Sequence, residues 1–481
     1  MGKVRTAIVG AGFGGVAIAN ELKRRGHEDI VILEQAADVG GVWRDNTYPG
    51  AACDVPTPYY SLSYEPNPRW PRRYAEQPDI LRYIQHVVDK YDLRRHLRLG
   101  SKVTAARWED GRWVLSLADG DKVEADVLIP AVGQLSRPSY PAIEGREEFA
   151  GIAFHSAEWR HDVDLTGKRV GVIGTGASAV QFVPKIQPVV DQLTVFQRSA
   201  PYLLPRMDTQ FSATHHRIFE KLPFTQKAER GAWFGLGEGL GVALLHSRAL
   251  AQVFTGVCRS HMRRGCAGDP SLFERVWPTY PIGCKRVLFV NDYLPALCQP
   301  NASLVTTGIE RITPRGVRTV DGVDHDFDVL IWGTGFKATD FLAPLEITGL
   351  DGRDLAETWK DGARAYLGIA VPDFPNLFIM YGPNTNLGSG SIIYMLESQA
   401  RYIGQAIDSF AGRPVVVRRE VEAAYDDQIQ RRLVDGVWSK CDNWYRVASG
   451  RVVSNWPKLP FQYRRDTRRF DAADYEVVTT P

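Results

Sequence analysis

Two glycine-rich turns, each directly after an apolar stretch, constrain the fold of this 481-residue chain more than any other feature. The first reads Gly10-Ala-Gly12-Phe-Gly-Gly15 and the second reads Gly174-Thr-Gly176-Ala-Ser-Ala179. Turns of this kind present backbone N–H groups at a helix N-terminus to the pyrophosphate of a dinucleotide. The chain is therefore expected to bind two dinucleotides.

The residue that ends the next strand distinguishes the two sites. In the first unit a strand at 5–10, a helix at 16–25 and a strand at 29–34 end in Glu34, which lies 19 residues after Gly15. In the second unit Arg198 lies 19 residues after Ala179. A carboxylate binds ribose hydroxyls and repels a 2′-phosphate, whereas a guanidinium binds that phosphate. The sequence predicts FAD at the first site and NADPH, in preference to NADH, at the second. The alternative for the first site is a βαβ unit that binds no ligand, and the alternative for the second is that Arg198 is a surface residue at a strand end.

A repeated strand pattern indicates two copies of one α/β architecture. Asp-Val-Leu-Ile occurs at 126–129 and again at 328–331, in each case after short strands with an Asp-Gly turn. We expect two Rossmann-like domains, with the NADP domain inserted in the FAD domain and a mostly helical insertion. The expected boundaries are 1–150 and 338–481 for the FAD domain, 151–205 and 282–337 for the NADP domain, and 206–281 for the helical insertion.

The C-terminal third is expected to return to the FAD domain. Residues 376–381 are predicted to form a strand and 382–388 a glycine-rich loop. A helix at 391–403 would then direct its N-terminus toward the flavin. The aromatic segment that holds Trp438, Trp444 and Trp456 has no clear role in this scheme.

Bulk properties exclude several classes of protein. A net charge of +2 argues against a nucleic-acid partner, which would require a basic stripe. The longest apolar stretch, 233–245, is interrupted by Glu238, so we expect no integral membrane segment. No signal peptide is expected before the first strand, which favours a cytoplasmic protein. Six cysteines without a Cys-x-x-Cys pair favour a reducing compartment and argue against a zinc ribbon or a redox-active disulfide.

Two further segments have the composition of functional loops. Residues 41–54 show neither helical nor strand period, contain a Pro49-Gly50 turn, and follow the first cofactor unit directly. Residues 149–159 immediately precede the second unit and must join the two cofactor sites. Their fixed positions are Phe149, Gly151, His155 and Trp159.

Both segments resemble the signatures of type I Baeyer–Villiger monooxygenases. The patterns are Phe-x-Gly-x-x-x-His-x-x-x-Trp at 149–159 and Gly-x-Trp-x-x-x-x-Tyr-Pro-Gly-x-x-x-Asp at 41–54. Related flavin-containing monooxygenases usually place Tyr or Phe at position 159, and Arg160 stands where Baeyer–Villiger members usually have Pro or Asp. The resemblance covers about residues 4–460. It implies an NADPH- and O2-dependent FAD enzyme that inserts oxygen beside a ketone carbonyl, through a C4a-peroxyflavin, to give an ester or lactone.

The resemblance also implies site residues. Lys285 would contact the NADP phosphate, Arg286 would be the active-site cation, and Asp54 would orient its guanidinium. His155 and Trp159 are assigned to domain coupling. No metal is expected. The candidate cofactor contacts at both sites are Gly10, Gly12, Phe13, Gly15, Glu34, Gly41, Val42, Trp43, Asp54, Tyr60, Val103, Gly174, Thr175, Gly176, Ala177, Ser178, Ala179, Gln181, Arg198, Ser199, Lys285 and Arg286.

Three alternative functions stay open at this point. An N- or S-oxygenating flavin monooxygenase shares the layout but uses an electrophilic oxidant. An NADPH-dependent disulfide reductase shares it too, but needs a redox cysteine pair. A non-catalytic dinucleotide sensor would bind both cofactors without turnover. For the oxygenase, the partners are O2 and a small ketone, which the aromatic insertion predicts to be apolar or aromatic; a monomer or homodimer is expected.

Overall fold

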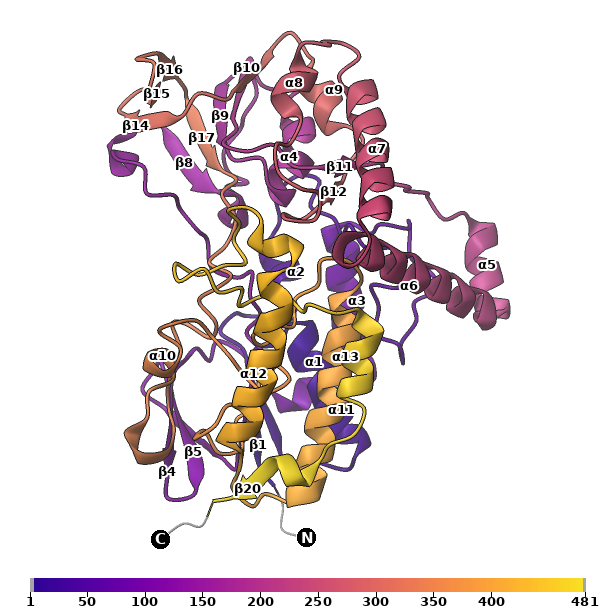
Figure 1. The fold of residues 1–481 in the computed structure, drawn as a ribbon, viewed down its shortest axis with the longest axis vertical. Helices are drawn as coiled ribbons and strands as arrows, with labels where there is room; N and C mark the ends of the chain where they lie inside the picture. The colour runs from indigo at the N-terminus through magenta and orange to yellow at the C-terminus, as the bar shows by residue number, and fades with distance from the viewer. Residues whose placement is uncertain (1–3, 479–481) are drawn as a thin grey trace.

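Two parallel sheets form the centres of the two lobes in the computed structural model, which describes residues 4–478 (Figure 1). The first has the strand order β3-β2-β1-β7. The second has the order β13-β10-β9-β17-β8. Their bounds are β1 (Thr6–Val9), β2 (Ile30–Leu33), β3 (Leu97–Arg98), β7 (Val127–Pro130), β8 (Ile152–His155), β9 (Arg169–Ile173), β10 (Gln192–Phe196), β13 (Ala302–Val305) and β17 (Val329–Trp332).

The four strands of the first sheet correspond in order to β13, β10, β9 and β17 of the second, which confirms the predicted duplication, and β8 is an additional edge strand. In the first sheet Thr6 pairs with Ile30 on one side and Val127 on the other. In the second, β9 pairs in parallel with β10 and β17 in the same way. Strands β1, β7 and β9 are mainly apolar and almost entirely buried, as expected for parallel strands covered on both faces.

Each copy contains the same accessory elements. A crossover helix follows the central strand: α1 (Phe13–Arg24) in the first copy and α4 (Ala177–Ile186) in the second. An antiparallel meander precedes the last strand of each sheet. The meander of the first copy consists of β4 (Val103–Glu109), β5 (Arg112–Leu117) and β6 (Lys122–Ala125), and β18 (Glu346–Thr348) extends it beside β4. The meander of the second copy consists of β14 (Ile309–Thr313), β15 (Gly316–Thr319) and β16 (Asp324–Asp326).

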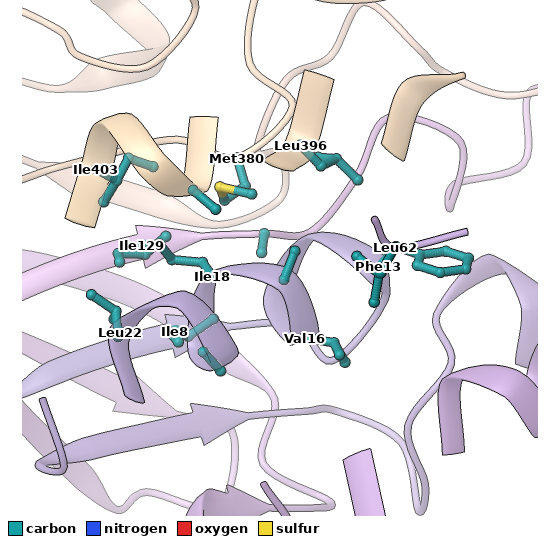
Figure 2. Packing of buried hydrophobic residues seen from close by; sticks show 14 of the residues in the cluster. Ile8, Phe13, Val16, Ile18, Leu22, Leu62, Ile129, Met380, Leu396 and Ile403 are labelled. Carbon is teal, nitrogen blue, oxygen red and sulfur yellow. The ribbon is translucent and has the colours of Figure 1, made fainter. Parts of the chain in front are cut away.

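The chain returns to the first lobe after β17. Residues 376–380 run beside β7, where Phe378 N–H donates to Leu128 O at 3.0 Å and Met380 N–H donates to Pro130 O at 2.9 Å. The predicted strand therefore adds to the sheet edge, although it is paired only as an isolated bridge. The predicted helix is α11 (Ile392–Phe410), which continues beyond 403. In Figure 2 α11 lies over α1, and its Leu396 and Ile403 belong to the same buried cluster as Ile18 of α1.

The predicted helical insertion is confirmed and projects to one side of the molecule (Figure 1). Strands β11 (Leu203–Leu204) and β12 (Leu288–Phe289) pair in parallel and bring its two ends together. No single helix within residues 4–478 is long and apolar enough to cross a membrane. The pair α6 (Pro223–Leu245) and α7 (Arg248–Gly265) has the length and composition only when both are taken together, and the two helices are bent by 108°. The helices are α5 (Ala213–Lys221), α6 (Pro223–Leu245), α7 (Arg248–Gly265) and α8 (Leu272–Val276).

The C-terminal segment covers α11 and the junction between the lobes (Figure 1). Trp438, Trp456 and Tyr463 form a buried cluster with Met395 of α11, which gives two of the three unassigned tryptophans a packing role. The remaining elements are α2 (Val42–Asp45), α3 (Gln77–Lys90), α9 (Tyr293–Leu297), α10 (Leu355–Thr358), α12 (Arg419–Val434), α13 (Pro460–Asp466), β19 (Val415–Val417), β20 (Tyr475–Val477) and six short 3-10 turns.

Two sequence-based expectations need correction. Residues 41–54 are not entirely irregular, because α2 forms one helical turn just after Gly41. The cysteines are not all unpaired, because Cys284 and Cys441 form a disulfide. These two residues are 157 positions apart, and only the tertiary fold brings their Cα atoms to 6.1 Å, so a search for close cysteine spacings misses them. Cys53, Cys258, Cys266 and Cys298 are free.

Candidate active site

The first glycine turn has the geometry of an anion cradle. A Cβ atom at Gly15 would lie 1.9 Å from Gly10 O, and one at Gly10 would lie 2.7 Å from Ala131 O. Both positions therefore require glycine. Gly12 caps α1 without a side-chain hydrogen bond, and the first turn of α1 carries no acidic residue. The first N–H groups of the helix are therefore available to a phosphate, which fits the pyrophosphate of FAD.

Glu34 is held in place at the end of β2. Its carboxylate is buried, and it accepts hydrogen bonds from Ala11 N–H at 2.9 Å and Ala36 N–H at 3.0 Å. Arg44 approaches it to 3.2 Å. The strand end thus places a fixed acceptor next to the glycine turn, while a contact with ribose stays a prediction. Arg44 is a site residue that sequence reasoning missed, although it lies inside the 41–54 signature.

The loop after β2 closes over the same turn. A Cβ atom at Gly41 would lie 3.2 Å from the Cα of Gly12, so the two glycines meet. Trp43 Nε1–H donates to the hydroxyl of Tyr60 at 3.1 Å, and the Tyr60 and Phe13 rings are 5.5 Å apart. These predicted contacts are therefore brought together around the first turn. Val103 lies apart from them, in the core shared with Leu33.

The second glycine turn repeats this construction. Gly174 has φ of +110°, and a Cβ atom there would lie 2.4 Å from Gly333 O. Gly176 caps α4 without a side-chain hydrogen bond, and the first turn of α4 contains no acidic residue. Thr175 Oγ1 donates to Ser199 O at 3.0 Å, which ties the turn to the end of the next strand. The site fits a second dinucleotide pyrophosphate.

Two cations that form no salt bridge within residues 4–478 lie beside this turn. Arg198 follows β10 and is exposed, and within residues 4–478 it makes no ion pair. Lys285 Nζ donates to Ser199 Oγ at 2.9 Å. Burial lowers the pKa of Lys285, and the charge of Arg198 lowers it further. Positive charges placed close together in this way favour a polyanion such as a 2′-phosphate.

Arg286 and Asp54 meet at the junction of the two lobes. Nη2 of Arg286 donates to both carboxylate oxygens of Asp54, at 2.6 and 2.7 Å. The Asp54 side chain is 15% exposed and that of Arg286 is 43% exposed. The Asp54 charge is the main cause of the raised pKa of Arg286. The predicted contact exists, so a permanently charged guanidinium is fixed at this position; its catalytic role stays a prediction.

Two tyrosines at this position were missed by the sequence analysis. Tyr445, from the C-terminal segment, is 2% exposed, and its hydroxyl is close enough to contribute to the raised pKa of Arg286. Burial raises the pKa of Tyr445 itself to about 12. Tyr381 lies nearby and donates through its hydroxyl to Asn386 Oδ1 at 2.7 Å. The only sequence signal was the aromatic content of the C-terminal segment.

The side-chain amide of Gln181 and a row of three packed aromatic rings connect the two lobes. Gln181 of α4 accepts a hydrogen bond from the Tyr48 hydroxyl at 2.9 Å and donates to Ala52 O at 3.0 Å, so its side chain binds the 41–54 loop. A contact of Gln181 with cofactor stays a prediction. The rings of Trp159 and Phe182 are 5.3 Å apart, and those of Phe182 and Tyr48 are 6.1 Å apart.

His155 lies at the end of edge strand β8 and is fully buried. Its Nδ1 accepts a hydrogen bond from Ala157 N–H at 3.1 Å. Burial lowers the pKa of His155 to about 4. The imidazole is therefore neutral near pH 7, which suits a structural part in the junction better than proton transfer.

The fold and site define a flavin- and nicotinamide-dependent oxidoreductase with two dinucleotide sites facing one junction. A family model described as pyridine nucleotide-disulphide oxidoreductase matches residues 7–213. A Baeyer–Villiger monooxygenase of Pseudomonas aeruginosa is 40% identical over 99% of this chain and 92% of its own length. One from Streptomyces coelicolor is 42% identical over 99% of this chain and 93% of its own.

Solved structures agree with these relatives. An oxidized steroid monooxygenase bound to NADP has a TM-score of 0.87 and 30% identity, covering 99% of this chain and 100% of the other. The OTEMO complex with FAD and NADP has a TM-score of 0.87 and 27% identity, covering 99% of each chain. The chain belongs to the Baeyer–Villiger monooxygenases, which use FAD and NADP. This confirms the family that the two sequence signatures predicted.

Proposed function

We propose that the chain oxygenates an apolar ketone at the Asp54–Arg286 junction, with FAD bound at the first glycine turn and NADPH at the second. FAD that NADPH has reduced supplies activated oxygen. The protein's own contribution is to hold both cofactors at one place and to supply a fixed positive charge there. The observation that carries the proposal is the contact between Arg286 and Asp54, which come from different lobes.

Arg286 is suited to stabilise the charge that oxygen insertion creates. Addition to a carbonyl carbon leaves negative charge on the former carbonyl oxygen, and a preorganised donor stabilises it. Asp54 engages only Nη2. Within residues 4–478 no acceptor is hydrogen-bonded to Nε or Nη1 of Arg286, so two edges of the guanidinium are free for reacting oxygen atoms or the nicotinamide.

Arg198 and Lys285 would select the phosphorylated nicotinamide cofactor. Both cations lie beside Ser199, immediately after β10, where the ribose of a dinucleotide on α4 would lie. By the same reasoning Glu34 would bind the ribose of FAD. His155 and Trp159 would couple the two domains, since Trp159 joins through Phe182 to the Tyr48 loop.

The domain boundaries and the substrate class are part of the same proposal. The FAD domain comprises 1–150 and 338–481, the NADP domain 151–205 and 282–337, and the helical insertion 206–281; the two separate sheets support this division. The insertion and the C-terminal segment meet next to Gly283, where Leu244, Leu245, Trp438 and Trp456 line a small gap of about 10 Å³ together with Lys458. Such walls favour an apolar or aromatic ketone over a charged one.

A substrate panel tests the proposal. Purified holoenzyme is supplied with NADPH, O2 and matched ketones and sulfides that differ in apolar size. The expected result is ketone-dependent NADPH oxidation with an ester or lactone heavier than the ketone by one oxygen atom. Sulfoxide or N-oxide formation without any ester would favour the N- and S-oxygenating alternative instead.

A further inference from the structure

The disulfide between Cys284 and Cys441 adjoins the proposed active-site cation. Cys284 directly precedes Lys285 and Arg286 and is fully buried. Cys441 lies in residues 437–446 of the C-terminal segment, here named the capping loop, and is partly exposed. The crosslink therefore joins the turn before β12, which carries Arg286, to a segment that arrives from the other end of the chain.

The capping loop meets each of three consecutive residues. Cys441 bonds Cys284, and the Asp442 carboxylate is close enough to Lys285 to offset part of the lowering of its pKa. Tyr445 lies against Arg286. The loop thus places one of its residues beside each of residues 284, 285 and 286. A shift of the loop would therefore change the surroundings of both Lys285 and Arg286.

Other bonds of the capping loop are mainly internal. Asn443 Nδ2 donates to Trp438 O at 2.7 Å and lies 3.8 Å from both disulfide sulfurs. Trp438 and Tyr445 are buried at the two ends of the loop, while Asp442 and Trp444 between them are exposed. The disulfide is the covalent link that fixes this exposed part to the NADP domain.

We propose that Cys284 and Cys441 form a reversible positioning crosslink that sets how tightly NADPH oxidation is coupled to oxygen insertion. The proposal rests on the proposed role of Arg286. With the bond formed, Tyr445 and Asp442 are held against Arg286 and Lys285. With the bond reduced, the exposed part of the loop, which includes Asp442, is free to leave Lys285, and Tyr445 is held only by its packing. Both cations lose part of their fixed surroundings, and activated oxygen is lost as hydrogen peroxide.

The oxidant for closing the bond is hydrogen peroxide, the product of uncoupled turnover. The partly exposed Cys441 thiol attacks one peroxide oxygen, forming a sulfenic acid and releasing water. The Cys284 thiol then displaces the remaining oxygen as a second water and forms the disulfide. Two thiols lose two electrons and two protons, and one peroxide becomes two waters. A dithiol reductant reverses the step by thiol–disulfide exchange.

Three of the four remaining cysteines are poor competitors for this chemistry. Burial raises the pKa of Cys258 and Cys266 to about 12 and that of Cys53 further, so these thiols stay protonated. Cys298 is partly exposed and free. Cys298 lies close enough to Cys266 to contribute to the raised pKa of that thiol, so it is the remaining cysteine that could compete, and Cys298→Ser provides the matched control.

The experiment compares holoenzyme treated with a dithiol or with a slight excess of hydrogen peroxide, each then freed of reagent. Alkylation under denaturing conditions followed by mass measurement should count six thiols in the first sample and four in the second. Peroxide released per NADPH consumed, with a saturating ketone, should be roughly tenfold higher in the reduced sample, because small displacements of a positioned group are costly. The rate of flavin reduction should differ little.

Variants separate this role from a merely structural one. Cys441→Ser should show the high peroxide yield after either treatment, and Cys298→Ser should switch as the unmodified protein does. An equal or lower peroxide yield from the reduced unmodified protein would overturn the proposal, as would six free thiols after peroxide treatment. Both of these outcomes are measured on the unmodified protein, so they do not require any variant to fold. If Arg286→Ala still made ester normally, the proposed function would fail while the thiol count remained unaffected.

Discussion

Nη2 of Arg286 donates to both carboxylate oxygens of Asp54, at 2.6 and 2.7 Å, across 232 positions of the chain. Asp54 ends a loop of the FAD lobe, and Arg286 begins the apolar stretch that leads into β12 of the NADP lobe. The contact therefore forms only when both lobes are correctly placed. The position of the positive charge at the junction therefore depends on the arrangement of the two cofactor sites.

Replacing Arg286 should separate flavin reduction from oxygen insertion. Reduction is hydride transfer and creates no oxyanion, whereas insertion does. We expect Arg286→Ala to be reduced by NADPH but to lose roughly a hundred- to thousandfold in ester formation, the usual cost of removing a preorganised donor. Stopped-flow absorbance at the flavin band and product mass measure the two steps.

Arg286→Lys should fail as well, because a single ammonium nitrogen cannot contact Asp54 and also present the Nε and Nη1 edges of the planar guanidinium. Arg318→Ala is a suitable control, since Arg318 pairs with Asp324 in the exposed meander of the same lobe. A normal ester yield from Arg286→Ala would remove this residue from the active site.

Arg198 should determine the choice between NADPH and NADH. Losing one hydrogen bond to a charged group costs about 1.5–3 kcal/mol, so Arg198→Ala should weaken NADPH binding by roughly ten- to a hundredfold and change NADH little. The NADPH affinity should also fall as pH rises through the lowered pKa of Lys285, since the neutral amine no longer attracts phosphate. Equal use of both cofactors by the unmodified protein would contradict this assignment.

Trp159→Ala should loosen the junction without releasing FAD. The indole packs on Phe154 and Phe182, and none of these rings contacts the first glycine turn. We expect retained flavin absorbance, slower turnover and more hydrogen peroxide per NADPH. Trp159→Phe keeps an aromatic ring and should recover part of the coupling. Unchanged coupling in the Ala variant would limit Trp159 to a packing role.

His155 should make the protein less stable in mild acid. Its pKa falls from 6.5 to about 4 on folding, so the unfolded chain binds a proton more readily. The stabilisation from the neutral imidazole is complete above pH 6.5 and is lost as pH falls toward 4, at about 1.4 kcal/mol per pH unit within that window.

His155→Asn removes the titration while it keeps an acceptor for Ala157 N–H. Thermal unfolding of the two proteins is measured from about pH 7.5 to about pH 4.5. The fall in Tm over this range should be smaller in the variant. Parallel losses in both proteins would show that His155 does not titrate in this range.

Local interactions made much of the molecule predictable. A glycine turn, the strand before it and the residue that ends the next strand lie within about thirty residues, so their spacing directly records the βαβ unit. The repeated Asp-Val-Leu-Ile pattern correctly indicated two copies, since β7 and β17 occupy equivalent places beside β1 and β9. The pairing of Arg286 with Asp54 was expected only through a family resemblance.

By itself the sequence determined the two α/β units, their order along the chain, the helical nature of the insertion and the opposite charges of Glu34 and Arg198. The tertiary structure alone decided that residues 376–380 join the edge of the first sheet, that Tyr445 lies against Arg286, and that Cys284 bonds Cys441. Turn geometry and strand period depend on neighbours in the chain. Contacts between residues 157 or more positions apart depend on how the two lobes and the C-terminal segment pack, and no short-range pattern encodes that.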